Sequence, residues 1–250
     1  MSTVSEGPQR RGVSEAAPLR AESEPSPLRA AVVGRGRMGR AVAAALERRG
    51  HNVIALLGRE DGLEAAAGAD VAFEFTVATS APHHVGWLLG LGVPTVCGTT
   101  GWDAAPLRAW ADERRVPLLV EANFSLGVAV MRRLVRDAAA RLLTLAEYDA
   151  GVFERHHNKK RDAPSGTALA LSAIAQQASG RTVPAVALRL GEQPGEHSVL
   201  FEGPDESLEL IHRARSRRLF AAGAVRAAEW LIARRPSGAV RLDDLLEEAS

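Results

Sequence analysis

The sequence of 250 residues has a single cysteine, Cys97, inside an apolar stretch. One cysteine excludes an intrachain disulfide framework and a zinc site built from cysteines. Charge of one sign is also lacking, because 31 Lys and Arg stand against 30 Asp and Glu, so no overall basic field indicates a nucleic-acid partner. Apolar runs long enough for a signal-peptide core or a membrane span are absent as well. We therefore expect a cytoplasmic protein with no nucleic-acid or membrane partner.

The chain is expected to begin with a disordered tail over residues 1–28, where Pro, Gly, Ser, Glu and Arg are mixed. Acidic residues in this tail count against an organellar targeting peptide. Beyond it, short apolar runs at 30–33, 53–57, 71–75, 94–97 and 117–120 alternate with helical stretches at 40–49, 84–91 and 104–114. This alternation predicts an α/β fold with a Rossmann-type, doubly wound parallel sheet.

The pattern changes near residue 124, where a long amphipathic segment runs to residue 143. Strand-like segments follow at 147–153, 184–190, 197–201 and 207–214, several of them alternating apolar and polar residues. They predict a second, α+β domain with an open mixed or antiparallel sheet. A closing helix over 219–234 is expected to pack back on the first domain. The predicted domains are thus 29–125 with 217–250 for a dinucleotide, and 126–216 for substrate and oligomerisation.

A glycine turn between the first strand and the first helix matches the dinucleotide fingerprint GxGxxG. The candidate cofactor-binding residues of this turn are Gly34, Arg35, Gly36, Arg37, Met38 and Gly39. An acidic residue that could bind the ribose 2′-hydroxyl is expected after the second strand, but that position is Gly58. Arg59 can instead pair with the 2′-phosphate of NADPH, and Glu60 is a less well placed candidate for NADH. These residues favour NADPH or dual use, and a glycine turn without a ligand is the alternative.

Two further turns follow strands of the same predicted sheet. They contain Gly98, Thr99, Thr100 and Gly101, and Ala122, Asn123, Phe124 and Ser125. Ligands of open α/β sheets bind at the carboxyl ends of the strands, so both turns are candidates for the nicotinamide neighbourhood. Ordinary strand-to-helix turns would look similar.

The most informative segment, 154–168, carries two adjacent His, two Lys, an Asp and a helix start. Imidazole suits proton transfer near neutral pH, and Lys160 follows His156 by four residues. Ser165 can cap a helix running to about Ala178, and such a helix start attracts carboxylate or phosphate. The segment predicts a site for an anionic substrate that needs a proton, with Asp162 orienting the loop by pairing with Lys160 or with a backbone N–H. A solvated basic loop is the alternative, and a metal role for His156 and His157 is disfavoured because adjacent residues seldom ligate one ion.

Six motifs in order along the chain resemble the 4-hydroxy-tetrahydrodipicolinate reductase (dihydrodipicolinate reductase) family. They are GRGRMGR, CGTTGW, EANFSLGV, ERHHNKKRDAPSGTALAL, GEHSVLF and AAGAVRAAEWL, and they extend over nearly everything after Leu28. The resemblance implies NAD(P)H-dependent reduction of a cyclic dicarboxylate in diaminopimelate and lysine biosynthesis. It also implies a homotetramer with a Rossmann domain and a substrate domain.

The resemblance implies roles for individual residues as well. His156 would be the proton donor and acceptor, and Lys160 the second proton donor. Substrate carboxylate would bind to His157, Ser165, Gly166, Thr167 and Thr100. The cofactor would contact residues 34–39, 98–100 and 122–125, and no metal is implied.

The chain departs from the family in several places. Its glycine turn is one residue shorter than the common GxxGxxG form, Val77 stands where many relatives carry Arg, and Lys159 adds a charge inside the basic loop. Two other functions stay open. One is another two-domain dehydrogenase, of an amino-acid or homoserine type, and the other is a dinucleotide-sensing binding protein whose basic loop docks an acidic partner.

Overall fold

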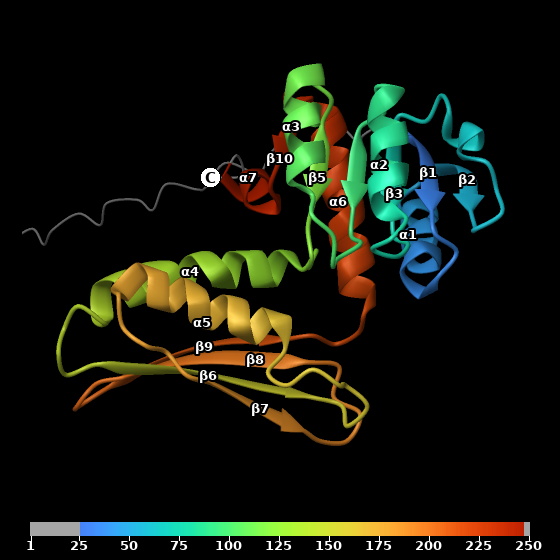
Figure 1. The fold of residues 1–250 in the computed structure, drawn as a ribbon. Coiled ribbons are helices and arrows are strands. Elements are labelled where there is room, and N and C mark those ends of the chain that lie inside the picture. The colour runs from blue at the N-terminus through green and yellow to red at the C-terminus, as the bar shows by residue number, and fades with distance from the viewer. Residues whose placement is uncertain (1–25, 248–250) are drawn as a thin grey trace, which may run out of the picture.

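The structure, a computed structural model, describes residues 26–247 and consists of two lobes (Figure 1). Residues 1–25 of the tail predicted over 1–28 lie outside the described residues. Leu28, the last residue of that tail prediction, is only 8% exposed and packs in the core of the first lobe. The packed chain therefore begins slightly before the boundary that we expected.

The first lobe contains a parallel sheet of six strands in the order β10-β5-β4-β3-β1-β2. Five of the strands coincide, within one residue at each end, with the apolar runs of the sequence. The strands are β1 Arg29–Val33, β2 Asn52–Leu57, β3 Val71–Glu74, β4 Thr95–Cys97, β5 Leu118–Val120 and β10 Ala239–Val240.

Helices cover both faces of this sheet. One face packs against α1 and α6, and the other against α2, α3 and the short 3₁₀ helix η1. The predicted Rossmann-type fold and the return of the closing helix to the first domain are confirmed. The helices of this lobe are α1 Arg37–Arg48, η1 Leu63–Ala66, α2 Ala81–Gly90, α3 Ala105–Arg114, α6 Arg218–Arg234 and α7 Leu242–Glu247.

The sixth strand was not predicted, because β10 has only two residues and carries no periodic pattern. Its place is fixed by Asp112, whose carboxylate accepts a hydrogen bond of 2.7 Å from the Ala239 amide. Gly238 precedes it with φ +84°, and a Cβ there would lie 2.2 Å from the Asp112 carboxylate. A contact distant in sequence, not a local propensity, therefore places this strand.

The second lobe contains a sheet of four strands in the order β7-β6-β8-β9. β6 and β7 are parallel, whereas β8 pairs antiparallel with β6 and β9, so the predicted mixed sheet is confirmed. One face packs on α4 and α5 around a buried apolar cluster. The elements are α4 Leu126–Leu142, β6 Asp149–His156, α5 Gly166–Ser179, β7 Ala185–Arg189, β8 Glu196–Glu202 and β9 Ser207–Arg213.

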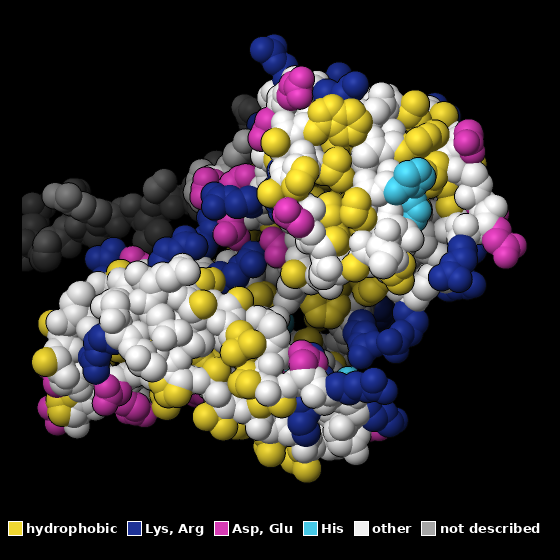
Figure 2. All heavy atoms as spheres, in the orientation of Figure 1, with side chains coloured by type: hydrophobic (Ala, Val, Ile, Leu, Met, Phe, Trp, Pro, Cys, Tyr) yellow, Lys and Arg dark blue, Asp and Glu magenta, His cyan; other side chains and the backbone are white. Residues whose placement is uncertain are grey.

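The opposite face of the second sheet is uncovered and carries an apolar patch beside an ion-pair cluster of Arg155, Glu196 and Arg213. Strand alternation directs Phe153, Val186, Leu188 and Ile211 to this face, and their exposed fractions lie between 39% and 59%. Figure 2 shows hydrophobic side chains along this edge of the second lobe. Among residues 26–247, no helix is long and apolar enough to cross a lipid bilayer.

Candidate active site

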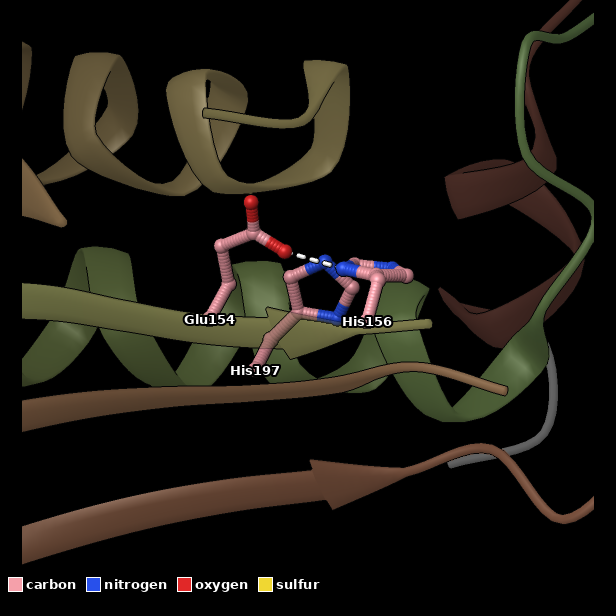
Figure 3. Close-up of side chains that lie close together, drawn as sticks. All are labelled: Glu154, His156 and His197. Atoms are coloured by element: carbon pink, nitrogen blue, oxygen red, sulfur yellow. Dashed lines mark hydrogen bonds and ion pairs between the residues drawn. The ribbon is translucent and has the colours of Figure 1, made fainter. Parts of the chain in front are cut away.

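Strand β6 presents Glu154 and His156 on one face, because side chains two residues apart in a strand point the same way. This face meets α4 and α5, and both side chains are buried, with exposed fractions of 0% and 8%. Figure 3 shows the two side chains on β6, joined by a dashed line, with His197 of the neighbouring strand β8 beside them. A carboxylate and two imidazoles thus meet inside the second lobe.

Glu154 is bound by three donors. Arg189 Nη2 donates at 2.7 Å and the Ser165 amide at 3.0 Å to one carboxylate oxygen, and His156 Nδ1 contacts the other. Burial alone would raise the pKa of this carboxyl. The hydrogen bond from Arg189, the nearby His156 and the Ser165 amide outweigh burial, so the pKa lies below its usual value. Glu154 is therefore ionised at neutral pH.

His156 is held by this carboxylate on one side and by a ring on the other. The His197 ring lies edge-on, with 5.1 Å between ring centroids. Burial lowers the pKa of His156, Glu154 raises it, and Lys160 and Arg189 lower it again, so that the balance lies below the usual value. Because Nδ1 faces Glu154, Nε2 is the nitrogen left for a substrate. Gly195 gives it room, since a Cβ there would lie 2.8 Å from Nε2.

Lys160 lies in the loop that follows β6. Its Nζ is 2.8 Å from each carboxylate oxygen of Asp162, which is one of the two pairings that the sequence predicts for Asp162. The hydrogen bond from Lys160 is the main reason why the pKa of Asp162 is lowered. The Asp162 carbonyl accepts a hydrogen bond from Arg189, which connects the loop to the buried Glu154.

Ser165 caps α5 as predicted. Its Oγ accepts a hydrogen bond of 3.3 Å from the Ala168 amide and lies 3.1 Å from His197 Nε2. Burial, followed by the nearby His156, lowers the pKa of His197 to about 4, so this imidazole is neutral at neutral pH. Gly166 is exposed, and a Cβ there would have no atom within 4 Å. The start of α5 is therefore open to an anion.

The ligand atoms of Glu154, His156 and His197 lie within 4.8 Å of one another, which is close enough to hold a metal ion. Glu154, however, already binds the cation Arg189 on one oxygen and His156 on the other. Lys160 and Arg189 also lower the pKa of His156, so the electrostatic surroundings of the cluster oppose an added cation. The contacts favour proton handling at this cluster.

The glycine turn of the first lobe has the close backbone packing and the uncapped helix start that suit a bound dinucleotide. A Cβ at Gly39 would lie 1.7 Å from the Gly34 carbonyl oxygen, so glycine permits the close contact of turn and helix. Gly36 is the N-cap of α1, where no side chain caps the amides and the first turn has no acidic residue. Helix starts of this kind bind pyrophosphate. Arg37 and Arg35 are exposed beside the turn, and Met38 packs partly on the core.

The other two predicted turns lie next to the glycine turn, and one of them reaches the second lobe. The Thr99 hydroxyl accepts a hydrogen bond of 2.8 Å from the Thr76 amide, and the rings of Phe75 and Phe124 are 5.9 Å apart. Asn123 Nδ2 donates to Thr167 Oγ1 at 3.1 Å, which joins the turn after β5 to the start of α5. Thr100 and Ala122 are exposed. Cofactor and substrate candidates are thus in direct contact at Asn123 and Thr167.

The turn after β5 ends at Ser125, which is bound to the second lobe. It is the N-cap of α4, where its Oγ accepts a hydrogen bond of 3.2 Å from the Val128 amide, and it also lies 3.2 Å from His212 Nε2 on β9. Figure 2 shows Lys and Arg side chains of both lobes beside the hollow between them. The surroundings suit an anionic ligand.

Four residues near the predicted site had no role in the sequence analysis: Glu154, Arg189, His197 and Arg217. Glu154 precedes His156 by two residues and shares its face because β6 continues to His156, three residues beyond the end of the predicted strand. Arg189 lies opposite His156 through the β6–β7 register, and Arg217 Nη2 lies 3.4 Å from His157 Nε2. These two contacts depend on strand pairing and chain return, which no local pattern reveals.

Arg59 is exposed in the turn after β2, whereas Arg35 binds the end of that strand. The structure therefore places two arginines near the predicted ribose position. One is Arg59, which the sequence singles out, and the other is Arg35 of the glycine turn.

Comparison with known proteins agrees with this geometry. Models of the N-terminal and C-terminal parts of dihydrodipicolinate reductase match residues 28–124 and 127–246. The 4-hydroxy-tetrahydrodipicolinate reductase of Acidiphilium cryptum is 39% identical over 233 residues, covering 84% of this chain and 94% of the relative. That of Xanthomonas euvesicatoria pv. vesicatoria is 41% identical over 228 residues, with the same coverage.

Solved structures show the same fold. Dipicolinate-bound dihydrodipicolinate reductase from Paenisporosarcina sp. TG-14 has a TM-score of 0.77 at 21% identity, over 87% of this chain and 99% of that one. The family models cover almost all of residues 28–246, and the two relatives exceed one third identity over most of the chain. The predicted resemblance is therefore confirmed, and the chain belongs to the dihydrodipicolinate reductase family.

Proposed function

We propose that this chain reduces 4-hydroxy-tetrahydrodipicolinate to tetrahydrodipicolinate with NADH or NADPH, as part of diaminopimelate and lysine biosynthesis. The observation that carries the proposal is the buried Glu154–His156 pair beside Lys160 and the open start of α5. This arrangement offers a dianionic substrate both cations and proton donors. Family membership supports the reaction.

The nucleotide would be held mainly by backbone groups. Residues 34–39 would bind the pyrophosphate, because the glycines leave room for it and the start of α1 carries no side-chain cap. Residues 98–100 and 122–125 would line the nicotinamide neighbourhood. The bound reduced nicotinamide supplies the hydride. Arg59 and the missing acid at Gly58 favour NADPH or dual use.

His156 would act through Nε2, while Glu154 holds Nδ1 and fixes the orientation of the ring. The pKa of free His156 lies below its usual value, mainly because of burial. A substrate with two carboxylates would raise that pKa, because negative charge favours the imidazolium. His156 would therefore gain its proton when the anion binds and donate it to the substrate.

Lys160 is the second proton donor in this proposal. Asp162 holds its Nζ in place through both carboxylate oxygens until substrate enters. The substrate carboxylates would bind to His157, Ser165, Gly166, Thr167 and Thr100, of which Ser165, Gly166 and Thr167 form the start of α5. Arg217, which lies beside His157, adds a cation to the same place.

The uncovered apolar face of the second sheet supports a homotetramer. Phe153, Val186, Leu188 and Ile211 share this face: Phe153 lies opposite Val186, and Ser198 lies between Phe153 and Ile211. Faces of this kind indicate contact between subunits. Light scattering coupled to size-exclusion chromatography should give four times the chain mass of 26.5 kDa, and Val186→Lys with Leu188→Lys should give smaller species.

The reaction is tested by supplying freshly generated hydroxy-tetrahydrodipicolinate with each nucleotide and following loss of the reduced nicotinamide absorbance. Oxidation of NADPH, NADH or both is expected. Nucleotide binding without any oxidation would favour a dinucleotide-sensing protein instead. Oxidation only with an amino-acid precursor carbonyl would favour another two-domain dehydrogenase.

A further inference from the structure

Two histidines on neighbouring strands contact the serines that cap the two helices of the second lobe. His197 Nε2 on β8 lies 3.1 Å from Ser165 Oγ. His212 Nε2, at the paired position of β9, lies 3.2 Å from Ser125 Oγ. Each serine oxygen also accepts a hydrogen bond from an amide in the first turn of its helix, α5 or α4. The same imidazole–serine–helix arrangement therefore occurs twice, and only the one at α5 adjoins the proposed substrate site.

The other ring nitrogen of His197 decides which nitrogen carries the hydrogen. Burial lowers the pKa of His197 to about 4, so its ring is neutral near pH 7 and has one N–H. Its Nδ1 is buried and has no hydrogen-bond partner within residues 26–247. Buried N–H groups without an acceptor are rarer in folded proteins than acceptors without a donor. The hydrogen therefore belongs on Nε2, where Ser165 Oγ accepts it.

This hydrogen position determines what the Ser165 hydroxyl can do. A hydroxyl has one hydrogen to donate and two lone pairs that accept. With His197 Nε2 and the Ala168 amide both donating, the lone pairs of Ser165 Oγ are occupied and its own hydrogen is left over. The adjacent Gly166 is exposed and has open space where a Cβ would lie. A carboxylate at the start of α5 can therefore accept the remaining hydrogen.

We propose that His197 is a positioning residue that directs the Ser165 hydroxyl hydrogen to a carboxylate of the substrate. The inference rests on the proposed function and adds a residue that acts through Ser165. The other tautomer would have the opposite effect, because a lone pair on Nε2 would accept the Ser165 hydrogen and keep it from the ligand. A bond from a hydroxyl to a carboxylate is charge-assisted and stronger than one to a neutral acceptor.

The hydrogen position can be read from the nitrogen-15 chemical shifts of the His197 ring, in the full chain at pH 7. We expect the shift of an N–H nitrogen at Nε2 and of a bare nitrogen at Nδ1. The signals are assigned through bonds to the His197 backbone, so the wild-type protein suffices. A hydrogen on Nδ1 alone, or on both nitrogens, would overturn the inference whether or not the protein is active.

The consequence for binding is measured as the dissociation constant of dipicolinate, by isothermal titration calorimetry with saturating NADPH. Ser165→Ala should weaken dipicolinate roughly tenfold, because a charge-assisted bond is lost. His197→Leu should weaken it roughly fivefold, because the hydroxyl loses the donor that orients it. His197→Gln should restore most of the affinity, because its amide can donate in place of Nε2. With Ser165→Ala already present, His197→Leu should cost less than about twofold more.

His212→Leu is the matched control, because it removes the same kind of contact from the start of α4. It should change dipicolinate affinity by less than about twofold, since Ser125 lies outside the proposed substrate site. Equal losses in the two leucine variants would indicate general damage to the lobe and overturn the inference. A full further loss from His197→Leu in the Ser165→Ala protein would do the same, because it would show that His197 acts through another residue.

Thermal melting identifies any variant that does not fold, and the wild-type nitrogen-15 result decides in that case. A wild type that binds no dipicolinate, with the hydrogen found on Nε2, would instead overturn the proposed function.

Discussion

The two lobes build their halves of the site by different means. The first lobe uses backbone, since Gly34 and Gly39 meet at distances that no side chain allows and α1 starts without a side-chain cap. The second lobe uses buried charged side chains, in which Glu154 holds His156 and Arg189. Substitutions in the first lobe should therefore act by steric clash with backbone or nucleotide. Those in the second lobe should act by changing charge and proton transfer.

The largest effect is expected from Gly39→Ala. The new Cβ would lie 1.7 Å from the Gly34 carbonyl oxygen, which belongs to backbone and cannot turn away. We expect loss of nucleotide binding and a decrease of at least about 2 kcal/mol in the free energy of unfolding, measured by urea denaturation.

Gly36→Ala is the matched control, because a Cβ there has no atom within 4 Å. It should leave the free energy of unfolding nearly unchanged. It should still weaken nucleotide binding, if the pyrophosphate approaches this backbone. Equal destabilisation by the two substitutions would show that the distinction between packing and ligand clearance is wrong.

Lys160→Ala should lower turnover roughly a hundredfold or more, because a proton donor and a cation are lost together. Nucleotide affinity should stay nearly constant, since Lys160 lies in the second lobe. Lys159→Ala serves as the control, because its side chain is 77% exposed and pairs only loosely, at 3.4 Å, with Glu192. Steady-state kinetics and calorimetry check both, and comparable losses in turnover and nucleotide affinity would argue against the role of Lys160.

Glu154→Gln should lower turnover by about tenfold or more and move its pH profile. The donor must be protonated, its protonated fraction falls as pH rises above its pKa, and Glu154 raises the pKa of His156. The descending limb of the profile should therefore shift to lower pH in Glu154→Gln. An unshifted limb with reduced turnover would leave Glu154 a purely structural role.

Glu154→Ala should in addition destabilise the second lobe. It leaves Arg189 without the buried carboxylate that it binds at 2.7 Å. Breaking a buried ion pair in this way costs about 3 to 5 kcal/mol, which chemical denaturation would detect.

Asn123→Ala should have the smallest effect. It removes the hydrogen bond of 3.1 Å to Thr167 that joins the two lobes, worth about 1 kcal/mol. We expect the KM of the dicarboxylate to rise by severalfold while the free energy of unfolding of each lobe is nearly kept. A loss of turnover as large as that of Lys160→Ala would instead show that Asn123 takes part in the chemical step.

Much of the fold could be predicted because its signals are local. Apolar runs indicated β1 to β5, and Ser165 marked the start of α5. The His156 to Thr167 motif indicated an anionic substrate and a proton donor in the same way, because residue types next to each other in sequence carried the chemistry.

The remaining features depend on contacts between distant segments. Arg189 reaches Glu154 through the pairing of β6 with β7, and His197 reaches His156 through β8. Arg35 could be identified as part of a glycine turn, but its contact with Asp61 required the path of β2 and the following turn. Glu154 belongs here too, because the predicted strand ends at residue 153, whereas β6 continues to His156 and so puts Glu154 and His156 on one face.

The central claim is that His156 is tuned by an ionised, buried Glu154 and takes up a proton when a dicarboxylate binds. Nuclear magnetic resonance titration of the His156 ring, without ligand and with dipicolinate, tests it most directly. We predict a pKa below the usual value of about 6.5 in the free protein and a clear rise with dipicolinate. In Glu154→Gln the pKa should be lower in both states. A His156 pKa that responds neither to the dicarboxylate nor to the substitution would contradict the account.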